Sequence, residues 1–153
     1  MASANEHLRR IARHIAEHTA LYLRDPEAAH IWDSSVIGIP GPVKTLLLHT
    51  TGRKTGQGRP IVLQYFTPDD LYVVVGSKAG VADHPARYLN LLDEPKCRFQ
   101  AGAYGTKARA CSVAGEEYAR LWQYVCAEQP EYTKYQKRTD RQIPVVVLEP
   151  IED

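Results

Sequence analysis

The sequence predicts an α+β fold in which a mostly antiparallel β-barrel carries peripheral helices. Short apolar runs rich in β-branched and aromatic residues crowd the middle of the chain, and amphipathic helical segments flank them. The predicted order is helix, three strands, helix, two strands, helix, strand, with no repeating strand-helix-strand unit. A doubly wound parallel sheet is therefore excluded.

Size and composition indicate one globular domain. The chain has 153 residues, of which 44% are hydrophobic and 24% charged. Its 19 Lys and Arg against 18 Asp and Glu leave a formal net charge of +1, so we expect no surface built for nucleic acid. Cys97, Cys111 and Cys126 lack metal-binding spacing. They predict reduced thiols in a cytoplasmic protein without a metal site.

Residues 1–42 are predicted to form an N-terminal helical segment. An apolar stripe recurs at helical spacing over residues 5–23. The stripe comprises Leu8, Ile11, Ile15 and Tyr22, while Arg9, Arg13, His14, Glu17 and His18 are placed elsewhere on the helix. Asp25 and Pro26 predict the cap and first position of a second helix that ends near Ile31. We expect the segment to cover the main fold, and peripheral contact of its basic helix with the inner face of the membrane is the alternative.

Residues 43–153 are predicted to form the barrel domain. Its first three strands pair most simply as a β-meander, and a hairpin turning at Ala101 and Gly102 follows them. The predicted strands are Lys44–Thr50, Pro60–Phe66, Leu71–Ser77, Lys96–Gln100, Thr106–Val113 and Ile143–Leu148, and the helices are His84–Leu92 and Glu116–Gln129.

The connection between the first two strands is the most basic stretch of the chain. Arg53, Lys54 and Arg59 lie among three glycines, a composition suited to a phosphate or carboxylate ligand. The spacing matches neither the Walker A motif nor the dinucleotide fingerprint. On composition alone, an ordinary hairpin turn explains it equally well. Small residues and Lys78 follow the third strand, where freed backbone N–H groups could bind a flat ring.

Several motifs occur in order between Lys44 and Pro150. They are Thr50–Gln57 (TTGRKTGQ), Ser77–Gly80 (SKAG), His84-Pro85 with Tyr88–Leu91 (YLNL), Pro130–Tyr132 with Tyr135-Gln136, and Thr139–Pro150 (TDRQIPVVVLEP). Together they resemble the deazaflavin (coenzyme F420)-dependent nitroreductase family. The first forty residues carry no such match.

This resemblance implies a split β-barrel of the FMN-binding, flavin-reductase type, with about six mainly antiparallel strands. It also implies an F420H2-dependent oxidoreductase that transfers a hydride from reduced deazaflavin to a quinone, nitroaromatic or conjugated enone. One alternative is an FMN-dependent reductase of the same fold. Another is a non-catalytic carrier of F420, haem or a lipid.

The family motifs also imply roles for individual residues. Cofactor-binding roles fall on Arg53, Lys54, Thr55, Arg59, Pro60, Ile61, Val62, Leu63, Gln64, Val75, Gly76, Ser77, Lys78, Ala86, Arg87, Tyr88, Leu89, Asn90 and Tyr132. Tyr132 and Tyr135 are the candidate catalytic residues, and Tyr65, Tyr135 and Gln129 the candidate substrate contacts. Arg87 and Gln129 replace aromatic residues of several relatives, which indicates a smaller or more polar acceptor. We expect a monomer rather than a homodimer.

Overall fold

The computed structural model describes residues 4–51, 58–76, 88, 91–92 and 94–151. Its elements, in chain order, are α1 (Ala4–Arg24), α2 (Pro26–Ala29), β1 (Ile31–Trp32), the 3-10 helix η1 (Ser34–Ile37), β2 (Val43–Thr51), β3 (Gly58–Gln64), the 3-10 helix η2 (Pro68–Asp70), β4 (Tyr72–Val75), β5 (Lys96–Ala101), β6 (Tyr104–Ser112), α4 (Gly115–Glu128), α5 (Glu131–Lys137) and β7 (Val145–Pro150). Tyr88, Leu91 and Leu92 are helical, as predicted. The rest of the predicted helix His84–Leu92 lies outside the described residues.

The sheet curls so that its two end strands meet at a single point. Its order is β3, β2, β5, β6, β7, β4, and β1 pairs with the start of β2. All the strand pairs that the structure describes are antiparallel. The two end strands are joined by Phe66, two residues beyond the end of β3, and Val73 of β4, which exchange two backbone hydrogen bonds of 2.9 Å. We call the stretch between β3 and β4, over which the described residues form no further strand pairs, the seam, and it makes the barrel a split one.

One detail of the predicted topology was wrong. The first three long strands do not form a meander, because β4 pairs with β7 instead of β3. Val73–Val75 and Val145–Val147 are apolar on both faces, and their pairing buries both runs of valines. The sheet has seven strands against about six expected, and the additional one is the two-residue β1, which is too short to give a period-2 signal.

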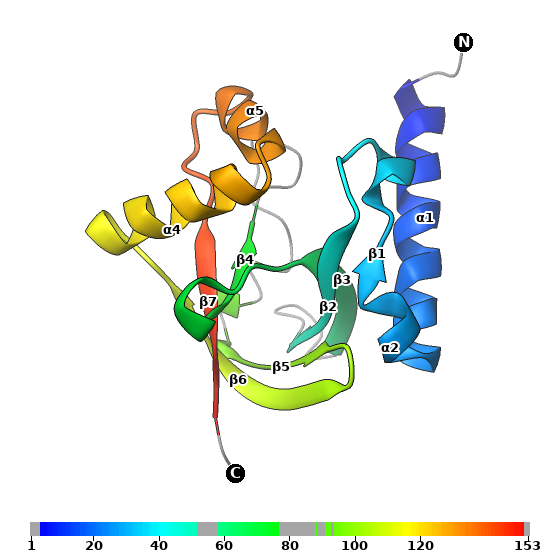
Figure 1. The fold of residues 1–153 in the computed structure, drawn as a ribbon, viewed down its shortest axis with the longest axis horizontal. Helices are drawn as coiled ribbons and strands as arrows, with labels where there is room; N and C mark the ends of the chain where they lie inside the picture. The colour runs from blue at the N-terminus through cyan, green and yellow to red at the C-terminus, as the bar shows by residue number, and fades with distance from the viewer. Residues whose placement is uncertain (1–3, 52–57, 77–87, 89–90, 93, 152–153) are drawn as a thin grey trace.

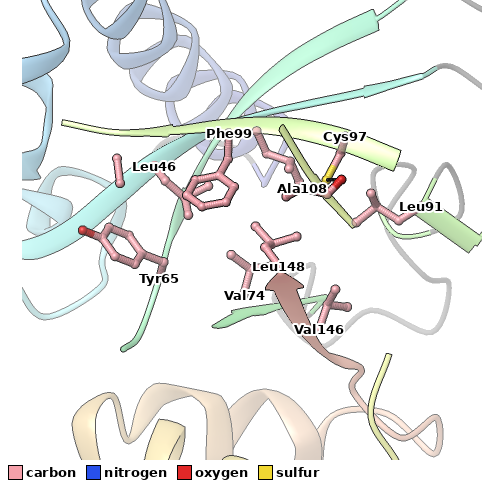
Figure 2. Packing of buried hydrophobic residues seen from close by; sticks show 11 residues of the cluster. Leu46, Tyr65, Val74, Leu91, Cys97, Phe99, Ala108, Val146 and Leu148 are labelled. Carbon is pink, nitrogen blue, oxygen red and sulfur yellow. Dashed lines mark hydrogen bonds between the residues drawn. The ribbon is translucent and has the colours of Figure 1, made fainter. Parts of the chain in front are cut away.

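The barrel interior is closely packed with alternate residues of the strands. Leu46 and Leu48 of β2 point inward, and Phe99, Val74 and Leu148 meet them from β5, β4 and β7. Tyr65, just after β3, lies at the edge of this cluster, and its hydroxyl points away from the other labelled side chains (Figure 2). The candidate site therefore rests on a rigid apolar core.

Helix α1 covers the outer face of β2 and β3 (Figure 1). Tyr22 is fully buried there against Leu47 and Val62. His18 is buried on this same face, although the sequence pattern placed it elsewhere. Its Nε2 lies 2.8 Å from the Ala29 carbonyl oxygen, and its ring stacks on Trp32. None of the described helices combines the length and apolar character that crossing a membrane requires.

Helices α4 and α5 lie on the opposite side of the barrel from α1, over β4 and β7 (Figure 1). Tyr118, Leu121 and Val125 of α4 pack on the valines of these strands, as the apolar spacing predicts. Helix α5 was not predicted. Its signals were Pro130 immediately before it and two tyrosines three residues apart.

Candidate cofactor and acceptor site

Much of the predicted cofactor site lies outside the described residues. The residues concerned are Arg53, Lys54, Thr55, Ser77, Lys78, Ala86, Arg87, Leu89 and Asn90. For Arg59 the structure describes the backbone, which lies in β3 opposite Thr50, but not the side chain. The geometry below therefore concerns β3, the end of β4, Tyr88 and the tyrosines near α5.

Strand β3 presents a hydrogen-bonding edge to the seam. The Tyr65 N–H donates to the Lys44 carbonyl of β2 over 3.1 Å. Because antiparallel residues alternate, Val62 and Gln64 direct their backbone N–H and C=O groups away from β2. Pro60 fits this register, since the N–H that it lacks would have faced the same edge. The predicted segment Pro60–Gln64 thus carries donors and acceptors that β2 does not use.

The end of β4 differs from the prediction in one respect. Gly76 does not offer a freed N–H, because this group donates to the Pro144 carbonyl at 2.9 Å. Its own carbonyl accepts a 3.0 Å hydrogen bond from Nη1 of Arg141. A Cβ at this position would lie 3.3 Å from Cγ of Pro144. The small residue is therefore explained by packing inside the fold.

Three of the predicted cofactor segments nevertheless come together. Leu63 of β3, Val75 and Gly76 at the end of β4, and Tyr88 line one small apolar cavity of about 10 Å³. The Tyr88 hydroxyl lies 3.2 Å from Oγ of Ser112. The seam is therefore bordered by residues from three separate segments of the chain.

An open cleft of about 360 Å³ begins where β3 ends. We call it the acceptor cleft. Its walls are the segment Pro40–Lys44, residues Gln64–Phe66 and the turn Glu128–Pro130. Two predicted substrate contacts, Tyr65 and Gln129, thus line the same cleft as Gln64, the last residue of the predicted cofactor-binding segment Pro60–Gln64.

Gln129 holds two walls of the acceptor cleft together. Its side chain is only 3% exposed. The Nε2 group donates to the Pro40 carbonyl at 3.0 Å and lies 3.5 Å from Oε1 of Gln64. The polar side chain of Gln129 is therefore a structural link across the cleft.

The Tyr65 hydroxyl is already engaged by another side chain. Its oxygen lies 2.6 Å from Nε2 of His30, and the residue is 5% exposed. Burial, with smaller contributions from Tyr22 and Tyr72, raises the pKa of Tyr65 to about 12. Tyr65 thus borders the cleft with its hydroxyl held by a histidine 35 residues away. No motif in the sequence indicated His30.

The two candidate catalytic tyrosines pack beside the cleft. Tyr132 is 8% exposed and contacts Phe66, a residue of the cleft wall, edge-on with ring centroids 6.0 Å apart. Tyr135 lies against Tyr132, with 5.8 Å between ring centroids. Burial raises the pKa of Tyr135, Glu131 adds to this effect, and Arg138 opposes it. The phenol therefore keeps its proton at neutral pH.

A family model described as F420H(2)-dependent quinone reductase matches residues 34–150. The chain belongs to this family. An F420H(2)-dependent quinone reductase of Mycobacterium tuberculosis strain H37Rv is 40% identical over 144 residues, covering 90% of this chain and 97% of that protein. A match of this extent reaches into residues 1–42, so the expectation of no resemblance there was wrong.

Two solved structures agree with the family assignment. An F420-H2-dependent reductase superposes with a TM-score of 0.64 at 34% identity, over 69% of this chain and 93% of that one. A structure described as a domain-swapped dimer gives 0.66 at 27% identity, over 88% and 96%. The predicted family resemblance and the split-barrel fold are confirmed. The enzymes of this family are F420H2-dependent reductases.

Proposed function

We propose that the protein transfers a hydride from reduced F420 to a quinone-type acceptor. Family membership supports the cofactor and the acceptor class. The structural observation that carries the proposal is the edge of β3 that faces away from β2 and that pairs with no other described strand. Strand β3 follows the cationic connection of residues 52–57 in the sequence and ends at the acceptor cleft. When bound, the deazaflavin supplies the hydride. The protein has to bind the cofactor and the acceptor, orient them toward each other and exclude water.

The residues bordering the seam fit a deazaflavin. Its pyrimidinedione ring carries carbonyl oxygens and an N–H, which match the backbone groups that Val62 and Gln64 direct away from β2. Leu63, Val75 and Tyr88 supply apolar surface beside this edge. We propose that Arg53, Lys54, Thr55 and Arg59 hold the phosphate and acidic tail. Ser77, Lys78 and residues 86–90 complete the site in this proposal.

The acceptor is proposed to bind in the acceptor cleft. Tyr65 and Phe66 lie in one wall of the cleft, and Gln129 links the turn Glu128–Pro130 to the Pro40 carbonyl. Hydride addition to a neutral quinone gives a hydroquinone monoanion, which then needs one proton. Tyr132 and Tyr135 are the proposed donors of this proton, although burial makes Tyr135 a weaker acid than a free phenol.

The first test is a side-by-side titration of the purified protein with F420 and FMN. We expect F420 to bind more tightly, and F420H2 to be oxidised anaerobically when menadione is added. Arg59→Ala should weaken F420 binding by about 5- to 150-fold, the range of one to two charge-assisted hydrogen bonds.

Arg109→Ala is the matched control, because Arg109 is exposed on β6, two strands away from β2. Unchanged F420 affinity in Arg59→Ala would reject the proposed tail site. Tighter binding of FMN would overturn the cofactor assignment. Binding of F420 without oxidation would indicate a carrier.

Three further expectations belong to the same proposal. Free thiols at Cys97, Cys111 and Cys126 support a cytoplasmic location. Residues 1–42 are proposed as a segment that packs on the barrel domain of residues 43–153.

Because α1 already covers β2 and β3, we also propose that the protein is a monomer. Sedimentation velocity tests it, and a dimer like the domain-swapped neighbour would contradict it.

A further inference from the structure

One cation in the acceptor cleft is not explained by the sequence motifs. Lys44 is exposed at the start of β2, and it lines the cleft with Gln64 and Tyr65. Its Nζ donates to Oγ1 of Thr67 at 2.9 Å and lies 5.0 Å from the centre of the Tyr65 ring. Both contacts hold the ammonium at the aromatic wall of the cleft.

The charge of Lys44 has no carboxylate partner among the described residues. Their ion pairs involve His14, Arg120 and Lys134, and no described carboxylate oxygen lies within 4.0 Å of the Lys44 Nζ. The ammonium has three N–H donors, and one of them donates a hydrogen bond to the hydroxyl of Thr67. The others can reach a ligand in the cleft. Glu128 is the acidic residue of the cleft lining, and it lies on the turn that forms the other wall.

The effect of this charge reaches the buried side of Tyr65. His30, which holds the Tyr65 hydroxyl, has a lowered pKa because of burial first and the positive charge of Lys44 second. The ammonium and the imidazole therefore both lie against the Tyr65 side chain. An acceptor bound in the cleft beside Tyr65 and Phe66 would place its ring oxygens near the ammonium.

We propose that Lys44 makes the acceptor cleft selective for quinones that carry an ionised oxygen. This inference rests on the proposed function, since it names the acceptor class of that same site. A flat quinone ring suits the aromatic wall, and an oxyanion on the ring accepts a charge-assisted hydrogen bond from the ammonium. The same contact stabilises the monoanion formed when a neutral quinone takes up a hydride.

The test compares two naphthoquinones that differ in one substituent. 2-Hydroxy-1,4-naphthoquinone is an anion at neutral pH, whereas 2-methyl-1,4-naphthoquinone is neutral. Equilibrium dialysis of each against the protein, with and without oxidised F420, gives a ratio of affinities that does not depend on turnover. Lys44→Met should lower the preference for the hydroxyquinone by roughly fivefold to thirtyfold, and Lys44→Arg should retain most of it.

Lys96→Met is the matched control, because Lys96 is an exposed lysine at the far end of β5. It should leave the ratio unchanged. The effect of Lys44 should also shrink in 0.5 M salt, since the ammonium is exposed. An unchanged ratio in a folded Lys44→Met protein would overturn the inference. If that protein still binds and oxidises F420H2, the proposed function survives, whereas failure of wild-type protein to bind F420 rejects the proposed function itself.

Discussion

Tyr132 shows how a single side chain joins packing to the acceptor cleft. Its ring meets Phe66 and Tyr135 edge-on and tilts against Trp122. These contacts involve the ring face and edge, which phenylalanine would reproduce. A substitution that removes only the hydroxyl therefore separates a role in the reaction from a role in packing.

Tyr132→Phe should lower quinone turnover about tenfold while changing F420 affinity by less than about twofold, if the phenol protonates the product. Steady-state kinetics with menadione and a cofactor titration provide the two values. Tyr124→Phe, on the exposed side of α4, is the control. Equal turnover in the Tyr132 variant would assign this residue to packing alone.

At the scale of an element, the docking of α1 depends on one buried hydroxyl. Oη of Tyr22 donates to the Thr45 carbonyl of β2 and accepts the N–H of Gly102 in the β5–β6 turn, both over 2.7 Å. Gly102 adopts a positive φ of 60°, and a Cβ there would lie 3.3 Å from the His30 ring. The turn is thus held between α1 and the residue that follows α2.

Tyr22→Phe should lower the free energy of unfolding by about 1–3 kcal/mol, because the buried N–H of Gly102 loses its acceptor. Urea denaturation followed by circular dichroism measures the change. Tyr124→Phe serves again as the surface control and should shift stability by less than about 0.5 kcal/mol. A Tyr22 variant as stable as wild type would show that water replaces the lost contact.

Local patterns predicted most elements but not their partners. Periodicity placed α1, the β5–β6 hairpin and α4 to within a few residues, because each depends on neighbouring side chains. The pairing of β4 with β7 joins residues about 70 apart in sequence, which no local pattern encodes. The same limit hid the His30–Tyr65 contact and the position of Lys44 in the cleft. Motif resemblance supplied the family, and topology alone brought Leu63, Val75 and Tyr88 together.

At the scale of the whole molecule, three histidines should make the fold sensitive to acid. Burial is the main cause of a lowered pKa at His18, at His30 and at His49. The unfolded chain therefore takes up these protons at higher pH than the folded protein does. The contribution of these three histidines to the free energy of unfolding should be complete above about pH 6.5, and it should decline as the pH falls below that value.

Thermal unfolding between pH 8 and pH 5 measures this decline, in a range where carboxylates contribute little. His18→Gln keeps a donor near the Ala29 carbonyl but cannot titrate, so its melting temperature should fall less steeply with pH. His7→Gln changes an exposed histidine of the same helix and is the control. Identical slopes in the His18 variant and wild type would contradict the prediction.

The hydrogen bond between Tyr22 and Gly102 also bears on how the chain is made. The two residues are 80 positions apart, so the first helix leaves the ribosome long before its hydrogen-bond partner exists. Its contacts with Thr45, Leu47 and Val62 become available once β2 and β3 are made, whereas the contact with the β5–β6 turn comes last. The docking of the first helix is therefore completed late, and nascent chains halted before residue 102 hold it with one buried hydrogen bond fewer.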